Sequence, residues 1–301
     1  MDLRWVEMRV GVIDVGSNTI RLLVADVEAG ALVPVAKDKV RLGLGEEIER
    51  FGTVSGLHVT AAAKAVAKMA GTARDAGAPS LDVFLTAPGR QSANAAELVA
   101  AIARRAAVPV RVLSAEEEGT LAYAGAVATT ELLLGPRVAV CDVGGASTEI
   151  AVGSPGAEPD WVRSVPLGSV RLTARVVRGE QPTADELDEA RAAAVEELSH
   201  LRPPEVAIAL AVGGSARAAR RLVGPELGEA ELAEALWIVG SKHPRVIARR
   251  YGVDRSRARI LAGGIVLLAE AQRQLDVPLH FCDGGIREGA VLASAQALAA
   301  A

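Results

Sequence analysis

Two short segments of this 301-residue sequence repeat one pattern, half a chain apart. In each, an apolar run ends in Asp, a turn of Gly and other small residues follows, and a second apolar run begins. The first contains Asp14 and Gly16-Ser17-Asn18; the second contains Asp142 and Gly144-Gly145-Ala146-Ser147. Apolar runs on both sides of a Gly-rich turn are typical of a β-hairpin. The repeat therefore predicts two similar α/β halves.

Between and after the hairpins, the pattern alternates between strands and helices. Apolar runs predict strands at residues 81–86, 108–113, 205–212 and 279–283. Helical periodicity or capping residues predict helices at 54–73, 94–106, 116–129, 183–201, 260–275 and from 287 onward. Such alternation predicts an α/β fold with mixed sheets.

Composition excludes several classes of protein. The net charge is −4, which argues against a general nucleic-acid binder. Cys141, Cys282 and the four scattered His predict neither a disulfide framework nor a zinc site. No long uncharged apolar run and no signal peptide are present, so we expect a cytoplasmic protein without a membrane span.

The two turns carry residues suited to phosphate. A Gly-rich turn lets backbone N–H groups approach an anion, and a Ser hydroxyl adds a donor. An Asp there would repel bare phosphate, so Asp14 and Asp142 are expected to hold Mg²⁺ or Mn²⁺, or to orient water. We therefore expect a phosphate clamp between two domains.

With these motifs, the sequence resembles the exopolyphosphatase and guanosine pentaphosphate phosphohydrolase family, within the superfamily of actin, heat-shock ATPases and sugar kinases. The resemblance spans nearly the whole chain, in order, through residues 11–22, 40–43, 86–94, 114–125, 142–149, 213–217 and 283–289. It implies an α/β fold of two actin-like (ribonuclease-H-like) domains with mixed sheets flanking a central cleft. Domain I is expected over 1–127, with the last helix, 287–301, packing back on it, and domain II over 128–286. The length resembles short members that lack a C-terminal helical domain.

The resemblance also implies an activity, with alternatives. The expected reaction is release of terminal phosphate from inorganic polyphosphate, with guanosine pentaphosphate as the sister substrate and Mg²⁺ or Mn²⁺ as cofactor. A kinase-like or ATPase member is one alternative, because Gly213-Gly214-Ser215 resembles the turn that holds adenosine in such relatives. A non-catalytic polyphosphate or alarmone sensor is another. No nucleic-acid or membrane partner is expected, and a homodimer is left open.

Specific roles come with the resemblance. Glu118 falls on the general base, and a carboxylate that orients or deprotonates water suits phosphoanhydride hydrolysis. If the alignment with the family is set aside, Glu117 is the alternative general base. Glu149 is the second expected catalytic carboxylate. Arg90 is the expected phosphate clamp, in a loop, because a guanidinium grips two oxygens; Arg21 and Arg257 are weaker candidates. The expected phosphate-binding residues are Ser17, Asn18, Arg90, Gly144, Gly145, Ala146 and Ser147.

The sequence departs from the family pattern at three places. Ala115 and Ala146 replace glycines, and Gly119-Thr120 replaces Ala-Arg. A methyl group at residue 146 disfavours positive φ. Thr120 removes a cation beside the expected base, Glu118.

Overall fold

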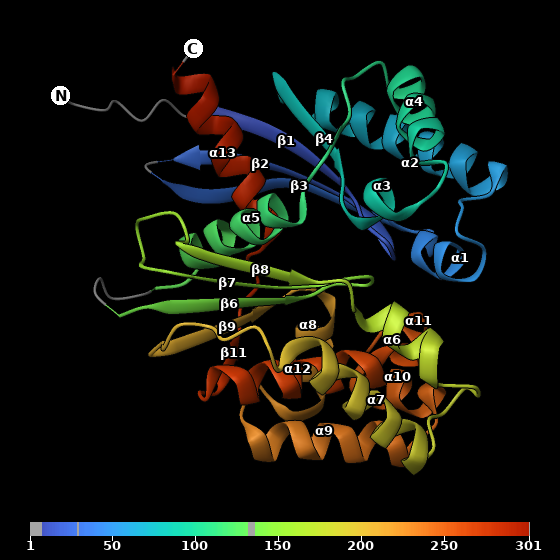
Figure 1. Cartoon of the computed structure of the whole chain (residues 1–301). Helices are drawn as coiled ribbons and strands as arrows, with labels where there is room; N and C mark the ends of the chain where they lie inside the picture. The colour runs from blue at the N-terminus through green and yellow to red at the C-terminus, as the bar shows by residue number, and fades with distance from the viewer. Residues whose placement is uncertain (1–7, 29, 132–135, 301) are drawn as a thin grey trace. The chain divides into compact units, whose positions relative to one another are not determined.

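The computed structural model describes residues 8–28, 30–131 and 136–300. The chain divides into two compact units. Unit 1 extends to Thr129 and resumes at Ile286, and unit 2 is Thr130–Gly285. Figure 1 labels most of the elements of each.

Unit 1 is built on a mixed sheet with the strand order β3-β2-β1-β4-β5. Its strands are β1 (Met8–Val15), β2 (Thr19–Glu28), β3 (Ala31–Arg41), β4 (Ser80–Leu85) and β5 (Arg111–Val112). The strands β1, β2 and β3 pair antiparallel, whereas β1, β4 and β5 run parallel. The carboxyl ends of β1, β4 and β5 therefore meet at one edge of the sheet.

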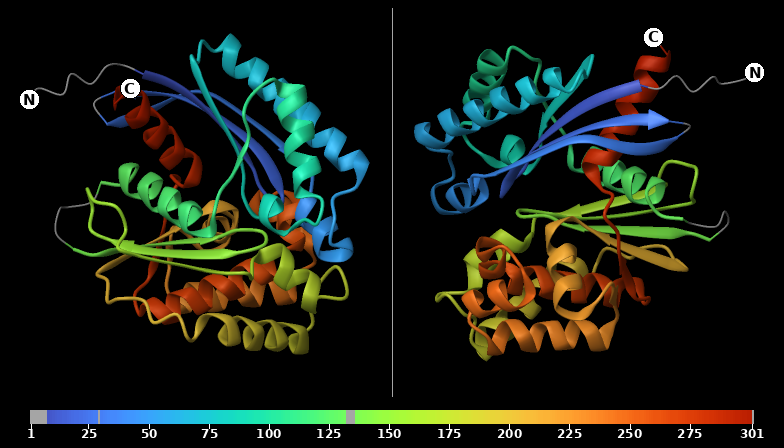
Figure 2. Two further views of the ribbon diagram at one scale, coloured as in Figure 1. Left: turned by 45° about the horizontal axis from the view of Figure 1, so that its top comes forward. Right: turned by 180° about the vertical axis from the view of Figure 1, so that it is seen from behind.

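Helices cover both faces of this sheet. They are α1 (Leu44–Phe51), α2 (Gly56–Asp75), α3 (Ala87–Gln91), α4 (Ala95–Ala106), α5 (Ala115–Ala128) and α13 (Ile286–Ala300). Alternation along β1 divides the core: Ile13 packs in the cluster under α2 and α4, while Val10 and Val12 pack with α13. In both views of Figure 2 the red C-terminal helix lies along the blue strands, on the side opposite α2. A Cβ at Gly289 would collide with the carbonyl oxygen of Leu121, so glycine permits the close packing of α13 on α5.

Unit 2 repeats the plan with the strand order β10-β11-β9-β6-β7-β8. Its strands are β6 (Val138–Val143), β7 (Thr148–Gly153), β8 (Trp161–Val165), β9 (Ile208–Val212), β10 (Glu226–Leu227) and β11 (Leu279–Phe281). The strands β6, β7 and β8 form the antiparallel part, and β6, β9 and β11 run parallel. The topology therefore confirms the two similar halves that the repeated hairpins predict.

The helices of unit 2 are layered on one face of its sheet (Figure 1). They are α6 (Ser169–Val176), α7 (Ala184–Leu198), α8 (Gly213–Val223), α9 (Glu229–Ser241), α10 (Pro244–Tyr251), α11 (Arg255–Arg259) and α12 (Leu261–Leu275). The central helix, α12, contacts β6, α6, α7, α8 and α9. Gly263 and Gly264 allow this approach, because a Cβ on either would lie 2.7 Å from the hydroxyl oxygen of Thr173 or Ser215. These glycines therefore permit the close packing of α12 on α6 and α8.

The predicted mixed α/β fold is confirmed, and three local expectations are corrected. The strand predicted at 108–113 is reduced to Arg111–Val112, because Pro109 has no N–H to donate to a ladder. Arg90 lies on the short helix α3 and not in a loop, since Pro88 suits the first turn of a helix. The strand predicted at 205–212 begins only at Ile208.

Within the described ranges, every helix is too short or too polar to cross a lipid bilayer.

Candidate active site

The first Gly-rich turn leaves two backbone donors available. The Gly16 N–H donates to Thr19 O at 3.1 Å and closes the turn. The carbonyl oxygens of Ser17 and Asn18 accept hydrogen bonds from the backbone of residues 42–45, at 2.7–3.2 Å. The N–H groups of Ser17 and Asn18 donate to no residue in the described part of the chain. The turn thus presents donors and turns its acceptors away.

The second turn is built in the same way. The Gly144 N–H donates to Ser147 O at 3.0 Å, and the carbonyl oxygens of Gly144 and Gly145 accept from the backbone of residues 169–171 at 2.8–3.2 Å. The N–H groups of Gly145, Ala146 and Ser147 donate to none of the described residues. Clusters of such N–H groups form anion-binding concavities. Both turns can therefore bind an anion such as a phosphoryl group.

Ala146 is compatible with this turn. It is not among the residues with positive φ, and its methyl group is buried. The third glycine of the family pattern is therefore not needed for the backbone conformation here. The neighbouring segment does need glycine: a Cβ at Gly168 would lie 2.5 Å from Ala146 N.

Glu118 and Arg90 form an ion pair. The Arg90 Nη2 lies 2.8 Å from Glu118 Oε2, and the side chains are 21% and 13% exposed. Arg90 Nη1 also donates to the carbonyl oxygen of Leu113, at 2.8 Å, which fixes the guanidinium between β5 and α5. Arg90 therefore supplies a cation beside Glu118. The family pattern has a further arginine near this glutamate, and this chain has Thr120 in its place.

Glu117 instead caps the N-terminus of α5. Its Oε2 accepts the N–H of Ser114 at 2.7 Å, while the Ser114 hydroxyl accepts the N–H of Glu117 at 3.1 Å. In this capping box Ser114 is the N-cap of α5. The hydrogen bond from the Ser114 backbone lowers the pKa of Glu117, and Arg111 lowers it further. Of the two rival acids, only Glu118 pairs with the expected clamp.

Asp14 stands at the end of β1 with an unsatisfied oxygen. Its Oδ1 is buried and has no hydrogen-bond partner among the residues that the structure describes. Desolvation raises the pKa of Asp14, the charges of Arg287 and Arg21 oppose that rise, and Glu288 adds to it. A buried carboxylate oxygen of this kind is suited to a cation or to a water held by one.

Asp142 and Glu149 stand side by side on the paired strands β6 and β7. A Cβ at Gly213, which has φ of +83°, would lie 2.5 Å from Asp142 Oδ1, so glycine makes room for that carboxylate. Glu149 is 2% exposed, and its Oε1 accepts the hydroxyl of Ser164 at 2.8 Å. Burial raises the pKa of the Cys141 thiol, and the two carboxylates raise it further.

Arg257 lies against the turn that follows β9. Its guanidinium occupies the space that a Cβ on Gly214 would need. Its Nη1 donates to Ser169 Oγ at 3.4 Å, and that hydroxyl donates to the carbonyl oxygen of Gly144 at 3.0 Å. The weaker sequence candidate Arg257 is thus linked through Ser169 to the second Gly-rich turn. Arg21 hydrogen-bonds the Thr19 hydroxyl at 3.2 Å, beside the first turn.

The expected residues gather at one edge of each sheet. In unit 1, Asp14 lies near the end of β1 and the first turn follows that strand, Arg90 follows β4, and Glu118 follows β5. In unit 2, Asp142 ends β6 and the second turn follows it, with Gly213 at the end of β9. Ligands of open α/β sheets bind at the carboxyl ends of the strands. Among the described residues, no group of three or more His, Cys, Asp or Glu could hold a metal by itself.

Sequence reasoning missed several supporting residues. Arg41 donates to Asn18, Ser164 donates to Glu149, Gly168 and Ser169 pack on the second turn, and Arg287 acts on Asp14. Gly168-Ser169, the glycine-serine pair after β8, is the one local sequence signal of such a supporting role. The other contacts join residues far apart in the chain.

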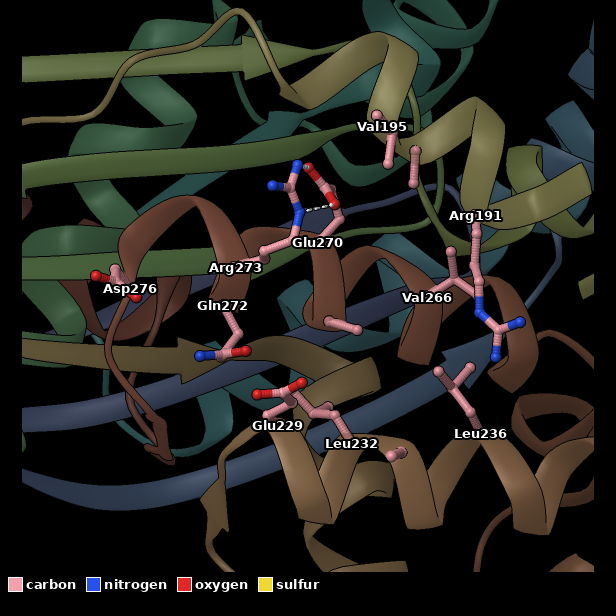
Figure 3. A pocket seen from close by; sticks show the side chains of 13 residues that line it. Arg191, Val195, Glu229, Leu232, Leu236, Val266, Glu270, Gln272, Arg273 and Asp276 are labelled. Carbon is pink, nitrogen blue, oxygen red and sulfur yellow. Dashed lines mark hydrogen bonds and ion pairs between the residues drawn. The ribbon is translucent and has the colours of Figure 1, made fainter. Parts of the chain in front are cut away.

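A pocket of about 410 Å³ lies elsewhere in unit 2, between α7, α9 and α12 (Figure 3). Its charged wall includes Glu270 and Arg273, which pair with each other at 2.6 Å. None of the expected site residues lines it.

Comparison with known sequences finds phosphatases. A model of the Ppx/GppA phosphatase family matches residues 23–224. Exopolyphosphatase 1 of Mycobacterium tuberculosis is 27% identical over 305 residues, covering 95% of this chain and 88% of that protein. An uncharacterized protein of Streptomyces coelicolor is 39% identical over 172 residues, covering 57% of this chain. That alignment spans 51% of the relative, about half of its length.

Solved structures agree in fold. The crystal structure of the Aquifex aeolicus Ppx/GppA family member superposes with a TM-score of 0.83 at 22% identity, covering 97% of this chain and 98% of that one. An exopolyphosphatase from Cytophaga hutchinsonii gives 0.85 at 18% identity, covering 96% and 98%. Likeness at such identity establishes the fold, whereas the family model matches more than half of the sequence. The chain belongs to the Ppx/GppA phosphatase family.

Proposed function

We propose that this protein is an exopolyphosphatase, which hydrolyses the terminal phosphoanhydride bond of inorganic polyphosphate. The observation that carries the proposal is the shared construction of the two turns, at residues 16–19 and 144–147. Each turns its carbonyl oxygens toward a supporting segment and leaves N–H groups as donors. The name of the Mycobacterium tuberculosis relative, exopolyphosphatase 1, supports this substrate class.

The side chains fit the roles that hydrolysis requires. Water attacks the terminal phosphorus, the bond to the bridging oxygen breaks, and the shortened chain leaves with the electron pair of that bond. In this proposal Glu118 accepts the proton of the attacking water, and Arg90, whose Nη2 lies 2.8 Å from Glu118 Oε2, holds phosphoryl oxygens beside that water. Glu149, fixed by Ser164, is the second carboxylate that could orient water.

The acids also fit a divalent cation. Asp14 Oδ1 in unit 1, which accepts no hydrogen bond from the described residues, and the carboxylate of Asp142 in unit 2 are each suited to Mg²⁺ or Mn²⁺ held through water, since Mg²⁺ needs few protein carboxylates when phosphate oxygens complete its shell. The ion would neutralise charge on the phosphates. The N–H groups of each turn would bind phosphoryl oxygens directly.

Phosphate release tests the proposal. Purified protein is assayed by malachite green with polyphosphates of several chain lengths, with guanosine pentaphosphate and with ATP. The expected result is release from polyphosphate with the highest kcat/KM. Preference for guanosine pentaphosphate would mean that this nucleotide, rather than polyphosphate, is the substrate of the same reaction. Preference for ATP would indicate a kinase-like relative. Binding of polyphosphate without release from any of them would indicate a sensor.

Removal of the clamp gives a specific prediction. Arg90→Ala should lower kcat/KM for polyphosphate about 10- to 100-fold, with a higher KM and a lower kcat, because hydrogen bonds to charged groups contribute about 1.5–3 kcal/mol. Arg90→Lys should recover part of this loss, since Lys keeps the charge but not the planar fork. Steady-state kinetics measures both. Arg104→Ala, on the exposed end of α4, is the matched control and should behave like wild type; an Arg90→Ala enzyme that did the same would contradict the role.

A further inference from the structure

The Asn18 side-chain amide is held through its oxygen atom. Asn18 is 8% exposed, and its Oδ1 accepts the Nε–H of Arg41 at 3.0 Å. Its Nδ2 makes no hydrogen bond with any residue that the structure describes. An amide can rotate by half a turn and exchange its donor and acceptor, so its orientation depends on its partners. A guanidinium has donors only, which obliges Oδ1 to face Arg41 and Nδ2 to face away.

Arg41 is itself fixed by its surroundings. It is the last residue of β3, and its Nη2 pairs with Glu46 Oε1 at 2.6 Å, in the first turn of α1. The next two residues, Leu42 and Gly43, donate their N–H groups to Asn18 O at 3.2 and 3.1 Å. Gly43 has φ of +69°, a conformation that favours glycine and turns the chain from β3 into α1. The segment therefore holds both the backbone and the side chain of Asn18.

The same segment also packs closely against Ser17, through Gly45. Gly45 N–H donates to Ser17 O at 2.7 Å, and a Cβ at residue 45 would lie 2.8 Å from Ser17 Cβ. A movement of the 41–45 segment would therefore be transmitted directly to Ser17 and Asn18. The segment is a preformed support for the turn.

We propose that Arg41 is a positioning residue for phosphate binding, which holds the Asn18 amide with its NH₂ group available to the ligand. The inference rests on the proposed function of the first turn as a phosphate site. In this orientation Asn18 adds side-chain donors to the free N–H groups of the turn. A fully ionised phosphoryl group, which only accepts hydrogen bonds, matches such a site. The opposite orientation would present a carbonyl oxygen to the phosphate and repel it.

A double-mutant cycle tests whether Arg41 acts through Asn18. The variants are Arg41→Met, Asn18→Ala and the combination, and the readouts are Kd for tripolyphosphate by calorimetry and KM and kcat with polyphosphate. Each single change should weaken binding about 10-fold, the scale of one hydrogen bond to a charged group. The double variant should be no weaker than Asn18→Ala, because Arg41 has nothing left to orient. Additive losses would show that Arg41 contacts the ligand itself, and would overturn the inference.

Further variants separate orientation from folding. Arg41→Lys, which can only donate, should keep more affinity than Arg41→Gln, which can also accept and so permits the amide to rotate. Equal losses in these two would contradict the proposal. Arg50→Met, an exposed arginine at the other end of α1, is the matched control and should bind normally. All variants are compared in melting temperature, since an orienting role predicts lost affinity at an unchanged Tm.

The binding readout distinguishes the two proposals. A wild-type protein that binds tripolyphosphate but releases no phosphate would contradict the proposed hydrolysis, while the cycle would still decide the role of Arg41. A wild-type protein that binds no phosphate anion would overturn the inference directly.

Discussion

Replacing Glu118 with Gln is expected to lower kcat for polyphosphate about 10²- to 10⁴-fold, the usual contribution of a general base. Gln keeps the size of the side chain and can still accept from Arg90, whose Nη2 lies 2.8 Å from Glu118 Oε2. It cannot take a proton from water. Substrate binding should therefore remain close to wild type, so that KM changes little while kcat falls. Steady-state kinetics, with binding measured separately by calorimetry, checks both statements.

Glu117 provides the control for this experiment. It is the preceding residue on α5, and its carboxylate serves the capping box with Ser114. Glu117→Gln should keep most of kcat and lower the free energy of unfolding by about 1 kcal/mol or less, the scale of one capping interaction. If Glu118→Gln kept more than a tenth of wild-type turnover, the base would have to be reassigned to Glu149 or Glu117.

The local parts of the site could be predicted from the sequence. The hairpin turns at residues 16–18 and 144–147 depend on near neighbours, and so does the capping box that begins at Ser114. Gly, Asp and Ser at fixed offsets determine such features within a few residues. The repeat of one hairpin half a chain later then predicted a repeated sheet.

The tertiary contacts could not be predicted in the same way. Arg90 and Glu118 are far apart in sequence, and no periodicity reports that they pair. The strand β3 was not predicted, because it lies at the sheet edge, contains Pro34 and is partly exposed at every position. Without β3 there was no reason to place Arg41 beside Asn18. Residues that support a site from a neighbouring element leave little local signal.

Activity is expected to require Mg²⁺ or Mn²⁺, and EDTA is expected to abolish it reversibly. The physical reason lies in Asp14, whose pKa is raised by desolvation and whose buried Oδ1 has no hydrogen-bond partner in the described part of the chain. An ionised carboxylate in such surroundings is unfavourable unless a cation or its waters compensate it. Polyphosphate adds further negative charge that a divalent ion would neutralise. Phosphate release is measured before EDTA, in EDTA, and after Mg²⁺ is restored.

Asp142→Asn extends this prediction to the second unit. The change keeps the size of the side chain beside Gly213 but removes its charge, so the Mg²⁺ concentration for half-maximal activity should rise. Mg²⁺ together with tripolyphosphate should also raise the Tm of the wild-type protein more than that of the variant, because a ligand that binds the folded state stabilises it in proportion to its affinity. Asp188→Asn, an exposed acid on α7 paired with Arg191, is the matched control and should leave both measurements unchanged. Full activity of the wild-type protein in EDTA would refute the metal requirement, because Asp14 and Asp142 would then serve the reaction without an ion.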